Sequence, residues 1–164
     1  MRRFQSIARS PLIMALFMTL AVAGCASKKN LPNNAGDLGL GGSATPGSQQ
    51  DFTVNVGDRI FYDLDSSVIR ADAQQTLTKQ AQWLARYPQY SITVEGHSDE
   101  RGTREYNLAL GQRRAAAARD FLASRGVPTN RMRTISYGKE RPVAACDDIS
   151  CWSQNRRAVT VLNQ

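Results

Sequence analysis

A dense group of charged and hydrogen-bonding side chains follows an apolar run near the middle of the sequence. The run Ser91–Val94 ends at Gly96, and the stretch "VEGHSDERGTREYN" (94–107) then places small, acidic and basic residues in nearly every position. Gly96 and Gly102 would let the backbone turn tightly and approach a ligand closely. The group is therefore either a solvated turn or a binding site, and the elements around it must decide between the two.

Three neighbouring residues have the types of a hydrolase triad, but not its arrangement. His97, Ser98 and Asp99 are consecutive, so their side chains cannot converge as base, nucleophile and orienting acid. The sequence also lacks a Gly-x-Ser-x-Gly motif and any metal-ligand spacing. We therefore expect a binding module that is not an enzyme and that carries no metal or cofactor, with His97 as a structural, hydrogen-bonding residue.

An arginine lies on the apolar stripe of a predicted helix that follows this group. In the helix expected over 104–124, steps of four residues lead from Leu110 through Arg114 to Ala118 and Leu122. Either the stem of Arg114 packs while its head reaches water, or its guanidinium lines a cleft and binds an anion. Because sites gather where strands end beside helix N-termini, Asp99 and Arg114 could flank one pocket with opposite charges. Such a pocket suits a zwitterion.

The remaining patterns predict the elements that must position this pocket. Alternation in the first expected strand places Ile60 and Tyr62 on one side and Phe61 on the other. Helix stop signals are present at Tyr87-Pro88 and at Gly126. The order β-α-β-α-β-β predicts an α+β fold, a two-layer sandwich in which two helices cover one face of a small mixed sheet. The expected strands are 58–64, 90–96, 132–138 and 157–163, and the expected helices are 71–86 and 104–124.

Four segments in order resemble one family. The stretch "GHSDERGTREYNLALGQRRA" (96–115) resembles the signature of the OmpA-like peptidoglycan-binding domain. The segments "FYDLDSS" (61–67), "SYGKERP" (136–142) and "NRRAVTV" (155–161) extend the resemblance over nearly all of 51–164. The resemblance implies an OmpA-like sandwich that holds the diaminopimelate-containing stem peptide of peptidoglycan without covalent bonds.

The resemblance also implies roles for individual residues. Asp99 would meet the ammonium of diaminopimelate, Arg114 would bind the carboxylate on the same carbon, and Leu110 would complete the pocket. Asp63 and Arg156 are weaker candidates, because Asp63 could equally cap a turn and Arg156 could pair with it structurally. We expect Arg114→Ala or Asp99→Ala to abolish binding to the cell wall with thermal melting nearly unchanged.

The N-terminus has the features of an export signal. Basic residues precede the apolar run 12–23, which is too short to cross a bilayer as a helix of about 20 residues. The segment "VAGC" resembles the bacterial lipobox, which implies that residues 1–24 are a signal peptide and that Cys25 is lipidated. Because Ala26 follows rather than aspartate, the resemblance implies anchoring in the outer membrane, with the domain facing the periplasm.

Residues 25–50 are rich in Gly, Ser, Asn and Pro, and we expect a lipidated start and flexible linker before a single domain over 51–164. Cys146 and Cys151, separated by four residues, would form a disulfide in an oxidising compartment.

The expected partners follow from charge and from the resemblance. Removing 1–24 leaves 18 basic against 14 acidic residues, a net charge of +4, and nucleic acid is not expected for an exported protein. With the lipobox, the chain resembles lipid-anchored members of the family that belong to the Tol-Pal system. The implied partners are peptidoglycan, the outer membrane and the periplasmic propeller protein of the Tol system. The alternative is a protein-interaction subunit in which Tol partner binding dominates.

Overall fold

The computed structural model describes residues 44–163, so the predicted signal peptide and the lipidation at Cys25 lie outside the described residues. Within this range the predicted order β-α-β-α-β-β is present, with further short helical segments before the first strand and before the last two strands. The elements are α2 (Gln49–Asp51), η1 (Phe52–Gly57), β1 (Arg59–Phe61), α3 (Ala71–Arg86), β2 (Ser91–His97), α4 (Arg104–Ser124), η2 (Thr129–Arg131), β3 (Met132–Gly138), α5 (Ile149–Asn155) and β4 (Arg157–Asn163).

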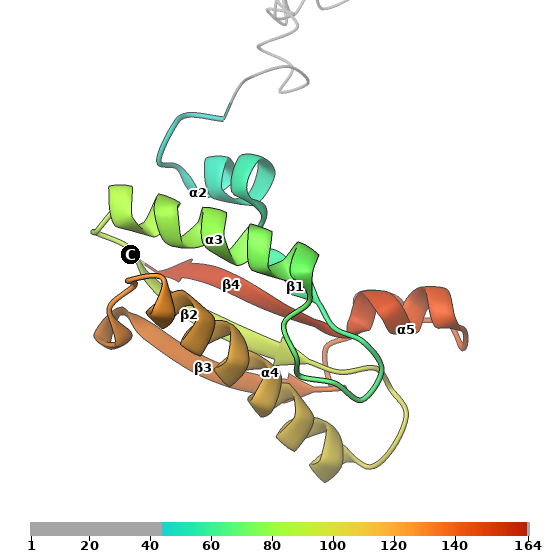
Figure 1. The fold of residues 1–164 in the computed structure, drawn as a ribbon. Helices are drawn as coiled ribbons and strands as arrows, with labels where there is room; N and C mark the ends of the chain where they lie inside the picture. The colour runs from blue at the N-terminus through green and yellow to red at the C-terminus, as the bar shows by residue number, and fades with distance from the viewer. Residues whose placement is uncertain (1–43, 164) are drawn as a thin grey trace, which may run out of the picture. The chain divides into compact units, whose positions relative to one another are not determined.

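The strands form one mixed sheet in the order β1-β4-β2-β3. β2 and β3 are parallel, with Ile92 opposite Met132, whereas β4 is antiparallel to both β1 and β2. The long helices α3 and α4 run across one face of this sheet (Figure 1). The predicted α+β sandwich with two covering helices is confirmed.

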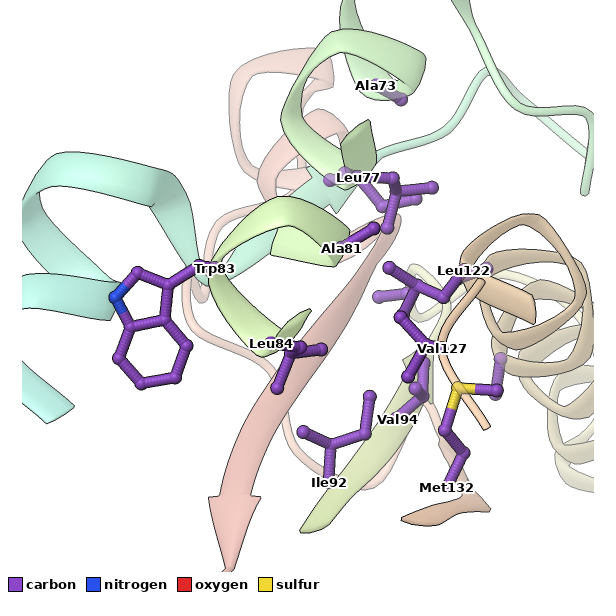
Figure 2. Packing of buried hydrophobic residues seen from close by; sticks show 14 of the residues in the cluster. Ala73, Leu77, Ala81, Trp83, Leu84, Ile92, Val94, Leu122, Val127 and Met132 are labelled. Carbon is purple, nitrogen blue, oxygen red and sulfur yellow. The ribbon is translucent and has the colours of Figure 1, made fainter. Parts of the chain in front are cut away.

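The core lies between this face of the sheet and the two long helices. Ile92 and Val94 of β2 point into it, because alternate residues of a strand face the same side. Leu77 and Leu84 of α3 and Leu122 of α4 close over them (Figure 2). The bounds of α3 and α4 match the prediction, since an apolar repeat and a stop signal coincide in both segments.

Two glycines set how closely α4 approaches the sheet. A Cβ on Gly96 would collide with the carbonyl oxygen of Gly111, and a Cβ on Gly111 would collide with the Ser136 hydroxyl. Gly96 therefore serves helix–strand packing and not the close approach to a ligand that its place in the sequence suggested. Gly102, which does have a left-handed backbone with φ 85°, retains its role in the turn.

The folded part begins before the predicted boundary at residue 51. The Gly47 N–H donates to the Asp51 carboxylate at 2.9 Å, and the Tyr90 hydroxyl donates to the Gly47 carbonyl at 2.9 Å. Asp51 also accepts the Trp83 indole N–H at 2.8 Å. Residues 47–51 thus contact the domain beside the start of β2, although their composition suggested a linker.

Two further segments differ from the sequence-based expectation. β1 is shorter than 58–64, because after Phe61 the chain enters a turn in which Asp65 has a positive φ of 54°. The helix α5 was not predicted, since "ISCWSQN" is short and has no apolar repeat. It begins where Asp148 accepts the Ser150 N–H at 2.7 Å. The predicted disulfide between Cys146 and Cys151 is confirmed at this end of the helix.

Candidate binding site

A cavity of about 300 Å³ opens where β2 ends. It lies between the turn that follows β1, the turn 98–103 and the N-terminal half of α4. Three residues predicted for the site, Asp99, Leu110 and Arg114, line the cavity together. The lining residues are Leu64, Asp65, Asp99, Arg101, Gly102, Tyr106, Asn107, Leu110 and Arg114.

Arg114 carries a buried positive charge without an acidic partner. The residue is 0% exposed, and no carboxylate within residues 44–163 forms a salt bridge with it. Its guanidinium donates instead to three backbone carbonyls, those of Ser66 at 2.8 Å, His97 at 2.8 Å and Asp63 at 3.1 Å. A guanidinium has five N–H donors, so two remain for a ligand.

The environment of Arg114 keeps the side chain in place and charged. The guanidinium carbon lies 5.2 Å from the ring centroid of Tyr62, whose hydroxyl donates to the Arg114 carbonyl at 2.8 Å. Burial lowers the pKa of Arg114 to about 10, which leaves the guanidinium protonated at neutral pH. An uncompensated buried charge is costly. An anion entering the cavity would therefore be stabilised.

The opposite charge is supplied by Asp99, which is 6% exposed. Its Oδ2 accepts from Arg101 Nη2 at 2.6 Å and from Arg156 Nη1 at 3.3 Å. Burial raises the pKa of Asp99, but the hydrogen bonds from Arg101 and Arg156 outweigh it and hold that pKa below its usual value. Asp99 is thus ionised at neutral pH. Asp99 and Arg114 line one cavity and are not bonded to each other.

The turn between Asp99 and α4 is built by local hydrogen bonds. The Asn107 side-chain amide donates to the Arg101 carbonyl at 2.7 Å and to the Thr103 carbonyl at 3.0 Å. Thr103 caps α4, because its hydroxyl accepts the Tyr106 N–H at 3.2 Å. These contacts fix Asp99, on the turn, relative to Arg114, on the helix.

Asp63 and Arg156 occupy different places from those suggested by the sequence. The Asp63 side chain is exposed and pairs with Arg70 at 3.2 Å, so only its carbonyl serves the site. The suggested pair between Asp63 and Arg156 does not form. Arg156 is buried, donates to the Tyr62 carbonyl at 3.2 Å and pairs with Asp99. Arg156 therefore supports the Asp99 carboxylate without lining the cavity.

Six of the nine lining residues were not predicted as site residues, among them Tyr106 and Asp65. The Tyr106 hydroxyl donates to the Asp65 carboxylate across the mouth of the cavity, joining α4 to the turn after β1. Tyr106 could have been found, since it precedes Leu110 and Arg114 on the same four-residue steps. Asp65 could not have been found, because the direction of its side chain depends on the left-handed backbone conformation at this residue.

His97 makes a different contribution from the one expected. Its ring is 2% exposed, and neither ring nitrogen has a hydrogen-bond partner among residues 44–163. Nε2 lies 3.6 Å from the Glu95 carboxylate, beyond hydrogen-bonding distance. The expectation of a hydrogen-bonding side chain was wrong, and only the carbonyl of His97 contacts Arg114. Burial, with a smaller effect from the positive charge of Arg157, lowers the pKa of His97 to about 4.

This shift predicts a pH dependence of stability. The pKa of His97 falls from an ordinary 6.5 to about 4 on folding, so between these values the unfolded chain binds more protons. The His97 contribution is fully present above pH 6.5 and is lost as the pH falls towards 4. We expect this contribution to be on the order of 2–3 kcal/mol. Urea unfolding at pH 7 and pH 4.5 measures it, and His97→Phe should flatten the difference. An equal slope in the variant would contradict the assignment.

Ligand atoms of Cys146, Asp148 and Cys151 lie within 4.8 Å of one another, but both sulfurs belong to the disulfide and offer no thiolate to a metal. Among residues 44–163, no helix has the length and apolar character needed to cross a membrane.

The two-layer sandwich is shared with proteins of a known family. Residues 61–157 match the OmpA family. The chain belongs to the OmpA family, as the sequence motifs indicated.

Particular relatives carry a common name. The chain is 88% identical to the peptidoglycan-associated lipoprotein of Brucella melitensis, over 99% of this chain and 98% of that protein. It is 80% identical to the protein of the same name from Rhizobium meliloti, over 98% and 92%. The crystal structure of the peptidoglycan-associated lipoprotein from Burkholderia pseudomallei is also similar. Its TM-score is 0.67 at 41% identity, and the match covers 71% of this chain and all of that chain.

Proposed function

We propose that this chain is an outer-membrane lipoprotein that binds diaminopimelate-containing peptidoglycan and thereby links the outer membrane to the cell wall. The observation that carries the proposal is the pair of opposite charges, Asp99 and Arg114, that line one cavity without bonding to each other. The names of the similar proteins from Brucella and Burkholderia support it.

The pocket suits an amino-acid head group. The two unused N–H donors of Arg114 would bind the carboxylate, and Asp99 would accept the ammonium on the same carbon. Leu110 and the ring of Tyr106 offer apolar contact for the carbon chain. A cavity of about 300 Å³ lies at the lower end of the range for small-ligand sites. It matches one residue of the stem peptide rather than the whole polymer.

Retention would come from many weak contacts. Each pocket holds one residue of the peptide, but lipidation at Cys25 and a repeating ligand would raise the effective concentration at each site. The first residues of the fold contact Tyr90, beside the start of β2, whereas the pocket lies at its end. A seven-residue strand spans roughly 20 Å, so the pocket would lie at the other end of β2 from the point where the membrane tether joins.

A second role, binding a protein of the Tol system, is supported by apolar side chains around the same cavity. Leu64 and Tyr106, which line the cavity, are 61% and 44% exposed, and Val68, four residues after Leu64, is 75% exposed. Exposed apolar groups beside a polar site are typical of protein interfaces. We propose that the propeller protein of that system contacts this rim and competes with the wall.

Co-sedimentation with isolated sacculi tests the proposal. The protein should pellet with the wall, free meso-diaminopimelate should release it, and no soluble wall fragments should appear. Pentane-1,5-diamine at the same concentration is the control, since it keeps the ammonium groups and the carbon chain but lacks the carboxylates that Arg114 would bind. A protein that stays in the supernatant, or that is released equally by both compounds, would contradict the proposed function.

A further inference from the structure

Arg101 lies between the Asp99 carboxylate and an aromatic ring from a distant part of the chain. Its Nη2 is 2.6 Å from Asp99 Oδ2. On the other side, its guanidinium carbon lies 4.0 Å from the ring centroid of Trp152, on α5. A cation this close to an indole face is attracted to it. The site turn and α5 are thus joined through one guanidinium.

Trp152 is held in this position from two sides. Its indole N–H donates to the Glu100 carboxylate on the site turn. The helix that carries it begins at the disulfide, and the Asn155 side chain closes the preceding loop by accepting the Val143 N–H at 2.9 Å and donating to the Ala144 carbonyl at 2.8 Å. The segment 143–155 therefore presents the ring to the turn as a fixed surface.

In this arrangement Arg101 occupies the position that a ligand ammonium needs. Asp99 accepts from both Arg101 and Arg156, and the carboxylate is 92% buried, since 8% of its side chain is exposed. The Arg101 side chain is 39% exposed, whereas that of Arg156 is 10% exposed and also donates to the Tyr62 carbonyl. Of the two arginines, Arg101 is therefore the one whose side chain can move away from Asp99 into solvent.

We propose that Trp152 is a positioning residue of the Asp99 subsite: its ring holds Arg101 on Asp99 in the unliganded protein, and the ligand's ammonium binds by displacing Arg101. This inference rests on the proposed function and names the selectivity of its pocket. A lone amine competes poorly for Asp99 with the guanidinium of Arg101, which is attached to the chain only two residues from that carboxylate. An ammonium whose neighbouring carboxylate is already bound by Arg114 competes well, because its second contact is intramolecular.

Affinity measurements on four variants test the displacement. The probe is a soluble muramyl tripeptide that ends in meso-diaminopimelate, titrated calorimetrically into the whole domain. Arg101→Ala and Trp152→Ala remove the competing cation or its support, so both should bind about twofold to fivefold more tightly than wild type, as expected for a partly exposed ion pair. Trp152→Phe keeps an aromatic face and should bind like wild type. Ile149→Ala, an exposed change on the same helix, is the matched control.

Tryptophan emission gives a readout that a purely structural role would not move. Trp83 and Trp152 are the two tryptophans of the chain, and Trp83 is buried among Phe52, Tyr87 and Tyr90 beside the start of β2. Removing the guanidinium from the Trp152 ring should change the emission when the probe is added. The change should be present in wild type and in Ile149→Ala and absent in Trp152→Phe.

The outcomes separate this inference from the proposed function. Weaker or unchanged binding by either Arg101→Ala or Trp152→Ala, with wild type binding the probe, would overturn the displacement alone. The same holds if wild-type emission does not change on binding. A wild-type domain that does not bind the probe would overturn both proposals. Arg101 is exposed, so its variant keeps the test valid if Trp152→Ala unfolds.

Discussion

Replacing Arg114 with alanine is expected to abolish ligand binding and to destabilise the domain by about 3 kcal/mol or more. The side chain is fully buried and donates to the carbonyls of Ser66, His97 and Asp63. Its loss would remove hydrogen bonds to three backbone carbonyls, of which the bond to His97 is buried, and would leave a cavity over the Tyr62 ring. Urea unfolding and co-sedimentation with sacculi measure the two effects.

This result would correct an expectation drawn from the sequence alone. The helical pattern suggested a binding residue whose removal leaves melting nearly unchanged, but the structure makes Arg114 a support of the turn after β1 as well. Arg114→Lys should be impaired in both respects, since one ammonium cannot reach three carbonyls and a ligand. Arg113→Ala, on the exposed side of the same helix, is the control and should behave like wild type. An Arg114→Ala variant of wild-type stability would contradict this account.

Replacing Asp99 with asparagine separates binding from folding more cleanly. The change keeps the shape of the side chain and removes its charge, so the affinity for a diaminopimelate-containing peptide should fall at least about thirtyfold, as is typical when a buried charged partner is lost. The free energy of unfolding should fall less in Asp99→Asn than in Arg114→Ala, because Arg156 keeps its hydrogen bond to the Tyr62 carbonyl. Calorimetric titration beside urea unfolding tests both expectations.

A matched control is available on α4. Asp120 is exposed and pairs with Arg119 at 2.7 Å, away from the cavity. Asp120→Asn removes the same charge from the domain and should leave binding unchanged. If both asparagine variants bind equally well, the ammonium is not held by Asp99.

The parts of this molecule that could be predicted are those in which local signals agree. α3 and α4 have apolar repeats that end at Tyr87-Pro88 and Gly126, and both helices appear with the predicted bounds. Arg114 stood out because a charged residue on an apolar stripe needs an explanation. The alternation that buries Ile60 and Tyr62 also places Asp63 outward with Phe61.

What could not be predicted depends on contacts between distant segments. The ion pair of Asp99 with Arg156 joins residues that are 57 positions apart, and the contact of Trp152 with Glu100 joins residues 52 apart. Neither pairing has a periodic signature. The helix α5 is likewise defined by its disulfide and its cap rather than by an apolar repeat.

The most direct measurement compares two peptides on the unchanged protein. A stem peptide with meso-diaminopimelate carries an ammonium and a carboxylate on its terminal carbon, whereas the same peptide with lysine keeps the ammonium and lacks that carboxylate. If Asp99 and Arg114 bind the two groups together, calorimetric titration should show at least about tenfold weaker binding of the lysine peptide, the loss expected for one charge-assisted hydrogen-bonded contact. Equal affinity for the two peptides would mean that Arg114 binds no ligand carboxylate.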